Sequence, residues 1–259
     1  MKRYIKVGMF LMWLSAALFC RQDISLCANA EFNSEDAFSE GNSLYRHNQY
    51  DAALSEYGKI LHSGLESGNL YYNVGNSYFK KGELGLAVLN YERARFLIPG
   101  DSDLRSNYDY ARSQLNLSSD ALPGNWFSRN LDKVFSNMNM NTLMLTLSLF
   151  YLFILIELAL RVFLGSRLKF YKTALAVLVL ILFLSGFAFY RRIEFFHKGA
   201  VVTVKEIEAK FEPLDKATTY FTLPEGSKVI VVDSSGDWLK VKRQDNKVGW
   251  VDRSGISLI

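Results

Sequence analysis

The sequence has little of the chemistry that enzymes and metalloproteins use. Its 259 residues include two cysteines and three histidines. Both cysteines, Cys20 and Cys27, lie in the first 30 residues, so a chain without that segment would have no thiol, disulfide or cysteine-ligated metal. The histidines are spread over separate segments without ligand spacing, at His47, His62 and His197. We therefore expect no catalytic residues, no metal and no cofactor.

Residues 1–30 have the layout of a secretory signal. Basic residues come first, an apolar run follows over 7–20, and Ala28-Asn29-Ala30 provides a small-x-small cleavage site. This predicts a signal peptide that is cleaved after Ala30. The polar stretch 21–25 leaves an uncleaved anchor as the alternative, and either version exports residue 31 onward.

Net positive charge is also scarce outside this segment. The formal charge of the whole chain is +4, and residues 1–30 contain four basic residues and one acidic residue, which leaves +1 for the rest. The exported parts have no clustered basic face of the kind that binds phosphate backbones. We expect no nucleic-acid partner.

Two long apolar runs organise the middle of the chain. Residues 142–160 contain one charge, and residues 173–190 contain none. A membrane-spanning helix needs roughly 20 apolar residues, so we predict transmembrane helices over 141–162 and 173–190. The loop 163–172 is basic, which predicts that it faces the cytoplasm and that both flanking regions lie on the exoplasmic side of a bacterial inner membrane. Buried core helices of a soluble domain are the alternative.

Glu157 is the one charge in the first run. It lies four residues before Arg161, the spacing at which opposite charges meet on a helix. We favour a paired structural carboxylate, and a proton relay is the alternative.

The region between residues 34 and 116 repeats with a period of 34 residues. Gly41 and Gly75 are related by this period, and so are Ala53 and Ala87, and Tyr57 and Tyr91. The period and these residues resemble tetratricopeptide repeats, which implies an all-α solenoid of two repeats. Residues 101–115 have helical periodicity and would cap the stack. Gly82-Glu83-Leu84-Gly85 is then an interhelix turn and not a phosphate loop.

This resemblance implies a partner-binding groove formed by the first helix of each pair. By position, the groove residues are Phe38, Asn42, Tyr45, Tyr72, Asn73, Asn76 and Phe79. The asparagines suit a peptide backbone and the aromatic residues suit apolar anchors. Two repeats are few for a stable solenoid, so we expect this region to rest on a partner protein or on a second copy of the chain.

Residues 117–140 connect the repeats to the membrane. After Pro123-Gly124, apolar residues recur at three- and four-residue steps from Trp126 to Met138. The pattern predicts an amphipathic helix that lies in the lipid headgroup layer. Packing against the repeats is the alternative.

The last region, residues 199–259, has the pattern of a small all-β barrel. Short β-branched runs alternate with turns at 234–236 and 245–247. Leu223-Pro224-Glu225-Gly226, Gly236-Asp237-Trp238 and Val248-Gly249-Trp250-Val251 resemble bacterial SH3-like domains. By this resemblance Phe211 and Trp238 occupy a candidate ligand site, whereas Trp250 is expected in the core.

The order of these parts resembles the BatE family of membrane proteins encoded in bacterial aerotolerance operons. The segment 103–112 adds to this resemblance. It implies a multi-domain membrane protein that works beside von Willebrand factor A-type membrane proteins and a MoxR-type ATPase. We expect a non-enzymatic adaptor that binds protein partners on the periplasmic face, or alternatively a protein that binds cell-wall peptides through its barrel.

Overall fold

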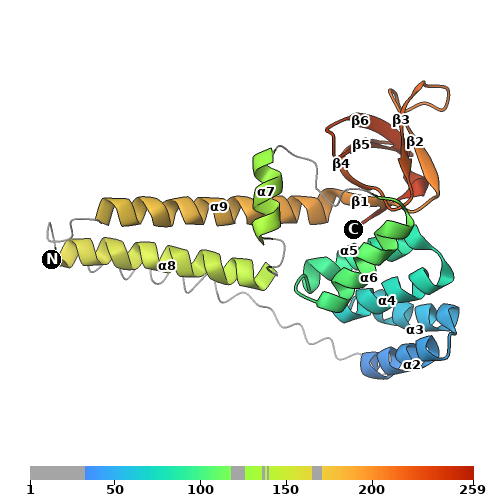
Figure 1. Ribbon diagram of the computed structural model, residues 1–259, viewed down its shortest axis with the longest axis horizontal. Helices are drawn as coiled ribbons and strands as arrows, with labels where there is room; N and C mark the ends of the chain where they lie inside the picture. The colour runs from blue at the N-terminus through green and yellow to red at the C-terminus, as the bar shows by residue number, and fades with distance from the viewer. Residues whose placement is uncertain (1–32, 118–125, 136–137, 139, 165–170) are drawn as a thin grey trace. The chain divides into compact units, whose positions relative to one another are not determined.

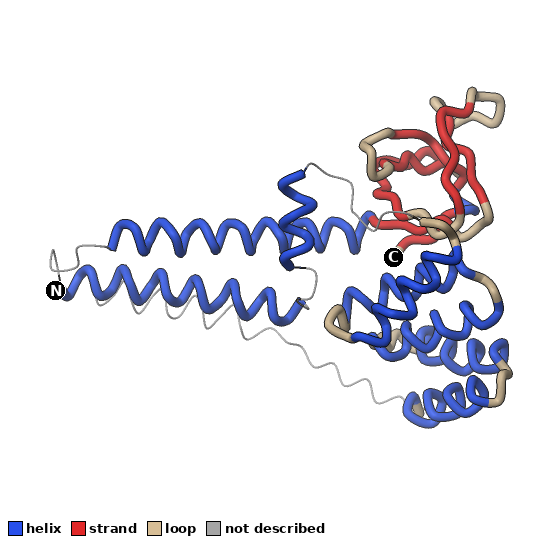
Figure 2. The backbone as a smooth tube through the Cα atoms, in the orientation of Figure 1, coloured by secondary structure: helices blue, strands red, loops and turns tan. Residues whose placement is uncertain are grey.

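The computed structural model describes residues 33–117, 126–135, 138, 140–164 and 171–259. The predicted signal peptide therefore lies outside the described residues, as do residues 165–170 of the predicted loop. Residues 34–259 form one unit (Figures 1 and 2). Its helices are α2 (Ser34–Arg46), α3 (Tyr50–His62), α4 (Gly68–Lys81), α5 (Leu84–Leu97), α6 (Ser102–Gln114), α7 (Trp126–Phe135), α8 (Met140–Leu164) and α9 (Tyr171–Lys198). Its strands are β1 (Gly199–Val202), β2 (Glu206–Lys210), β3 (Thr219–Pro224), β4 (Lys228–Ser235), β5 (Trp238–Lys242), β6 (Val248–Asp252) and β7 (Ile256–Leu258).

Helices α2 to α5 form two pairs that approach closely at glycines. A Cβ atom on Gly75 would lie 2.6 Å from the Tyr91 ring, and a Cβ on Gly41 would collide with the ring of Tyr57. Both tyrosines are buried, so neither ring can move aside at low cost. The sequence period of 34 residues is thus a packing period, in which a glycine of one helix faces a tyrosine of the next.

Local signals define where these helices begin and end. The Ser67 side chain accepts a hydrogen bond from the Leu70 amide (3.1 Å), and the Asp101 side chain accepts one from the Leu104 amide (2.8 Å). Such capping oxygens satisfy amides that have no partner within the helix. Gly82, with φ +79°, ends α4 in the left-handed conformation that glycine adopts readily. The predicted capping helix is α6.

The second helix of the second pair, α5, is buried around most of its circumference. Besides its apolar side chains, it buries Asn90 and Glu92. A helix that is buried on all sides must have neighbours on all sides. Here α4 and α6 cover one side, and β1 lies against another.

The strands form a seven-stranded antiparallel sheet in the order β3-β2-β6-β5-β4-β1-β7. Its core contains alternate residues of each strand, such as Leu239 and Val241 in β5 and Val251 in β6. The valine-rich segments were expected to be strands, whereas β2, β3 and β7 were not anticipated. The outer face of β6 includes Trp250, which is only partly buried, so the expectation that Trp250 belongs to the core is wrong.

Helices α8 and α9 are both apolar and long enough to cross a membrane. The candidate spans are Asn141–Leu160 and Lys172–Lys198. The sequence placed the end of the second helix at residue 190, but α9 continues as a helix to Lys198 and passes directly into β1. Its 28 residues measure about 42 Å at roughly 1.5 Å per residue, which exceeds a hydrocarbon core of about 30 Å. If α9 crosses such a core, it is long enough for its last turns to extend beyond it.

Both carboxylate oxygens of Glu157 in α8 are buried and have no hydrogen-bond partner among the described residues. The side chain of Arg161 lies outside the description, so the predicted ion pair stays a prediction.

Helices α2 to α6, which we call the helical region, contact the sheet along α5. The Glu225 carboxylate, in the turn before β4, accepts a hydrogen bond from the Gly85 amide at the start of α5 (2.6 Å). The negative charge is favourable there, because the first amides of a helix point outward with the positive end of the helix dipole. Further along α5, Arg93 donates to the Leu258 carbonyl (2.7 Å).

A buried ion pair lies between these two contacts. Lys228 Nζ of β4 is 2.9 Å from Glu92 Oε1 of α5, and both side chains are more than nine-tenths buried. Tyr108 of α6 also donates to Glu92 Oε1, and Arg112 donates to the Tyr108 hydroxyl (3.0 Å). Val201 of β1 belongs to the apolar core of the helices. The helical region therefore packs against the chain's own sheet, and support from a partner protein or a second copy stays a prediction.

Replacing Gly75 should show the cost of the close helix approach. We expect Gly75→Ala to lower the free energy of unfolding by about 1–3 kcal/mol, because the new methyl group overlaps the buried Tyr91 ring. Gly58→Ala is the control, since its Cβ would lie 3.9 Å from the nearest side chain. That change should raise stability by up to about 1 kcal/mol through helix propensity. Chemical unfolding of the full chain in detergent, followed by circular dichroism, measures both; equal effects would contradict the packing.

Removing the charge of Glu92 should weaken the contact between the helical region and the sheet and lower the free energy of unfolding. We expect Glu92→Gln to cost about 3–5 kcal/mol, because it leaves Lys228 charged and buried. Adding Lys228→Met should recover part of this loss. Glu56→Gln, which removes an exposed pair with Lys59, should cost less than about 1 kcal/mol. The same unfolding measurement applies, and similar losses for Glu92→Gln and Glu56→Gln would show that the buried pair has no special role.

Candidate partner-binding site

The seven predicted groove residues lie on α2 and α4, and all are partly exposed. Two of their asparagines are bonded to each other. Asn73 Nδ2 donates to Asn42 Oδ1 (2.8 Å), and the buried Tyr57 hydroxyl donates to the same oxygen (2.8 Å). Asn42 Oδ1 therefore accepts two hydrogen bonds from the repeat itself.

The same cluster recurs one period later. Tyr91 donates to Asn76 Oδ1 (2.8 Å), and Asn107 Nδ2 donates to that oxygen (2.9 Å). Asn107 Nδ2 is also 2.8 Å from the Tyr72 hydroxyl. Asn107 was not among the predicted groove residues. Its position 34 residues after Asn73 is the signal that could have identified it.

These clusters leave one side of each central asparagine available. Within the described part of the chain, the Nδ2 group of Asn42 donates to no other group, and Asn76 has a further side-chain hydrogen bond with Tyr72. Each Nδ2 has two N–H donors. The surface thus presents two amide donors in equivalent positions of consecutive helix pairs, which is suited to carbonyl oxygens of a bound chain.

Aromatic rings flank these donors. The ring centroids of Phe38 and Tyr57 are 6.0 Å apart, and those of Phe79 and Tyr110 are 5.5 Å apart. Burial and the neighbouring Tyr50 and Tyr72 raise the pKa of Tyr45. Burial also raises the pKa of Tyr57 to about 12, so its hydroxyl remains protonated at neutral pH and keeps donating to Asn42. The phenols therefore add apolar area and hydrogen bonds but no charge.

The predicted barrel site divides into two parts. Trp238 shares the outer face of the sheet with Trp250; Lys210 Nζ is 5.4 Å from the Trp238 ring and Lys240 Nζ is 5.4 Å from the Trp250 ring. Phe211 instead lies against Tyr220, with ring centroids 4.5 Å apart. Trp250 was not predicted here, although the alternation of β6, with Gly249 and Val251 facing inward, indicates its direction.

Comparison with known proteins identifies one of these regions. Residues 212–257 match the family model described as the bacterial SH3 domain. The match extends over β3 to β6, including Trp238 and Trp250. A comparison with curated proteins found no similar sequence. The chain therefore contains a bacterial SH3 domain, which follows a helical region and two apolar helices. In the described residues, no group of three or more histidine, cysteine, aspartate or glutamate side chains is arranged for a metal.

Proposed function

We propose that this chain is a membrane-anchored adaptor that binds protein partners and catalyses no reaction. The observation that carries this proposal is the repeated asparagine–tyrosine cluster, which leaves amide donors of Asn42 and Asn76 available between aromatic side chains. Main-chain recognition by such donors, with aromatic rings as anchors, suits an extended peptide or a partner's helix.

The helical region fits two tetratricopeptide repeats with a capping helix. Three features support this interpretation: the helix pairs α2/α3 and α4/α5, the glycine–tyrosine contacts at the same period, and α6 over the open end. In tetratricopeptide domains the first helix of each pair lines the groove, and α2 and α4 are those helices. The predicted groove keeps its seven residues, and we add Asn107 to them.

The contact between the helical region and the SH3 domain supports a location of both on the same side of the membrane. Lys228 and Glu92 form their ion pair at 2.9 Å, and such a contact cannot form across a bilayer. Two helices that cross the membrane in opposite directions satisfy this condition. The basic residues between them favour a cytoplasmic loop, so we place both regions on the periplasmic face of the inner membrane.

Helix α7 supports a further contact with lipid. It contacts α9, and Figure 1 shows it lying across that helix. Leu131 is buried, whereas Trp126 and Val134 are each 73% exposed. Arg192 of α9 donates to the Met138 carbonyl just beyond α7. An exposed tryptophan beside a membrane span suits the headgroup layer, as the sequence predicted.

The order of the regions supports a BatE-like role in assembling an envelope complex for aerotolerance. In that case the partners are von Willebrand factor A-type membrane proteins and a MoxR-type ATPase system. The predicted groove is the surface we assign to such proteins.

Changing the side-chain amides of Asn42 and Asn76 should reduce partner capture without disturbing the fold. In Asn42→Asp/Asn76→Asp, the acceptor oxygens for Tyr57, Tyr91 and their asparagine donors are kept, while the outward donors become acceptors that repel carbonyl groups. Loss of two hydrogen bonds, each worth about 1 kcal/mol, predicts at least roughly tenfold less capture. A photo-crosslinker at Lys80 of the full chain in cells, with mass spectrometry, measures this.

The control is Asn116→Asp/Asn246→Asp, which makes the same chemical change in exposed turns that have positive φ. It should leave crosslinking unchanged. The groove is not the binding surface if both double variants capture the same partners in equal amounts.

The alternative function is binding of cell-wall peptides by the SH3 domain. The tryptophans of β5 and β6, each with a lysine near its ring (Lys210 of β2 and Lys240 of β5), favour it. If it is correct, peptidoglycan stem peptides titrated into the full chain should change tryptophan fluorescence. Trp238→Phe should weaken this binding at least tenfold, whereas Trp126→Phe in α7 should not. Unchanged affinity of the Trp238 variant would exclude this face as the wall-binding site.

A further inference from the structure

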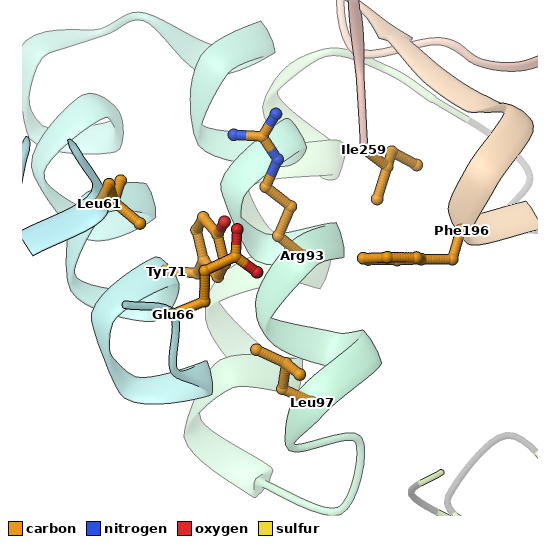
Figure 3. A pocket seen from close by; sticks show the side chains of 7 residues that line it. All are labelled: Leu61, Glu66, Tyr71, Arg93, Leu97, Phe196 and Ile259. Carbon is orange, nitrogen blue, oxygen red and sulfur yellow. The ribbon is translucent and has the colours of Figure 1, made fainter. Parts of the chain in front are cut away.

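A cavity of about 300 Å³ lies where the helical region, the end of α9 and the last residue meet (Figure 3). One part of its wall is apolar and consists of Leu61 of α3, Leu97 of α5, Phe196 of α9 and Ile259. The other part is polar and consists of Glu66, Tyr71 and Arg93. The volume is at the small end of the range for ligand pockets, roughly 300–1,000 Å³. A ligand of a few heavy atoms fits, and a folded partner does not.

The two charged side chains of the cavity do not neutralise each other. Within the described part of the chain, neither Glu66 nor Arg93 forms a salt bridge. Arg93 donates one hydrogen bond, to the Leu258 carbonyl, and lies 5.5 Å from the Tyr71 ring. A guanidinium has five N–H donors, so most of its capacity remains for a ligand. Figure 3 shows the Glu66 carboxylate beside the Tyr71 hydroxyl.

These charges restrict the chemistry of the ligand. A ligand with a single charge would be attracted by one of these side chains and repelled by the other, and an uncharged apolar molecule would pair with neither. A molecule that has an ammonium and a carboxylate on one carbon satisfies both. We propose that this cavity binds a free α-amino acid with an aliphatic side chain, through Glu66 to its ammonium, Arg93 to its carboxylate and the apolar wall to its side chain.

Tyr71 completes the polar part. Burial, followed by a hydrogen bond with Glu66, raises the pKa of Tyr71 to about 12, so the phenol is protonated at neutral pH. Its single O–H donates to the Glu66 carboxylate and helps to orient that group at the cavity. Because the wall comes from α3, α4, α5, the end of α9 and Ile259, an amino acid there would contact the helices α3 to α5, the end of α9 and the end of the sheet together.

The test is isothermal titration of the full chain in lipid nanodiscs with L-valine, L-leucine and L-methionine. We expect saturable one-to-one binding of at least one of them. Leucinol lacks the carboxylate and 4-methylpentanoate lacks the ammonium. Each should bind at least tenfold more weakly than L-leucine, since a charged hydrogen bond contributes about 1.5–3 kcal/mol. No saturable binding, or equal affinity for L-leucine and 4-methylpentanoate, would overturn the proposal.

Substitutions identify the site independently. Glu66 is exposed, so Glu66→Gln should fold normally. It should weaken L-leucine binding at least tenfold and leave binding of 4-methylpentanoate no weaker than before. Glu56→Gln is the matched control on α3 and should bind L-leucine as the unmodified chain does. Arg93→Lys keeps a cation but loses the bidentate geometry, and it should weaken binding of L-leucine more than that of leucinol. Unchanged L-leucine affinity in Glu66→Gln would place the ligand elsewhere.

Discussion

The rest of the structure depends on the buried ion pair between Lys228 and Glu92. It brings the first residue of β4 against α5, and Tyr108 and Arg112 of α6 and Arg95 of α5 extend its hydrogen-bond network. Buried charges are tolerated only where such partners are present. The position of β4 fixes β1, and β1 is the direct continuation of α9. This polar contact therefore helps to relate the helical region, the SH3 domain and the apolar helix α9 to one another.

This arrangement gives the candidate groove a defined setting. The sheet contacts the helical region at α5. The asparagine clusters lie on α2 and α4, away from this contact. The stacked rings of Phe96 and Phe196, 4.0 Å apart, connect α5 to the end of α9. In the proposed adaptor, the candidate groove would belong to a supported helix stack rather than to a flexible tether.

Much of the fold could be predicted from the sequence, because its signals are local and repeated. The 34-residue period identified the helix pairs, and the apolar runs identified α8 and α9. The end of α9 was misplaced because Arg191 and Arg192 end the apolar run. The helix nevertheless continues, and Lys198 Nζ lies 3.7 Å from Glu194 Oε1, an ion pair at the four-residue spacing of a helix. Trp250 was assigned to the core by residue type, whereas the alternation of β6 points it outward. The docking of Lys228 on Glu92 has no local signal, since its partners are far apart in the sequence. For the same reason the hydrogen bonds among the groove asparagines were not anticipated, although the period could have included Asn107.

The most direct test concerns the side of the membrane on which the two docked regions lie. Single cysteines at Glu40 in α2, at Asn246 in the barrel and at Ser166 in the basic loop, in a chain without Cys20 and Cys27, can be labelled in intact spheroplasts with an impermeant maleimide. Glu40→Cys and Asn246→Cys should both be labelled before lysis, and Ser166→Cys only after it. Labelling of only one of the first two before lysis would contradict the contact between α5 and the SH3 domain, and labelling of neither would contradict export.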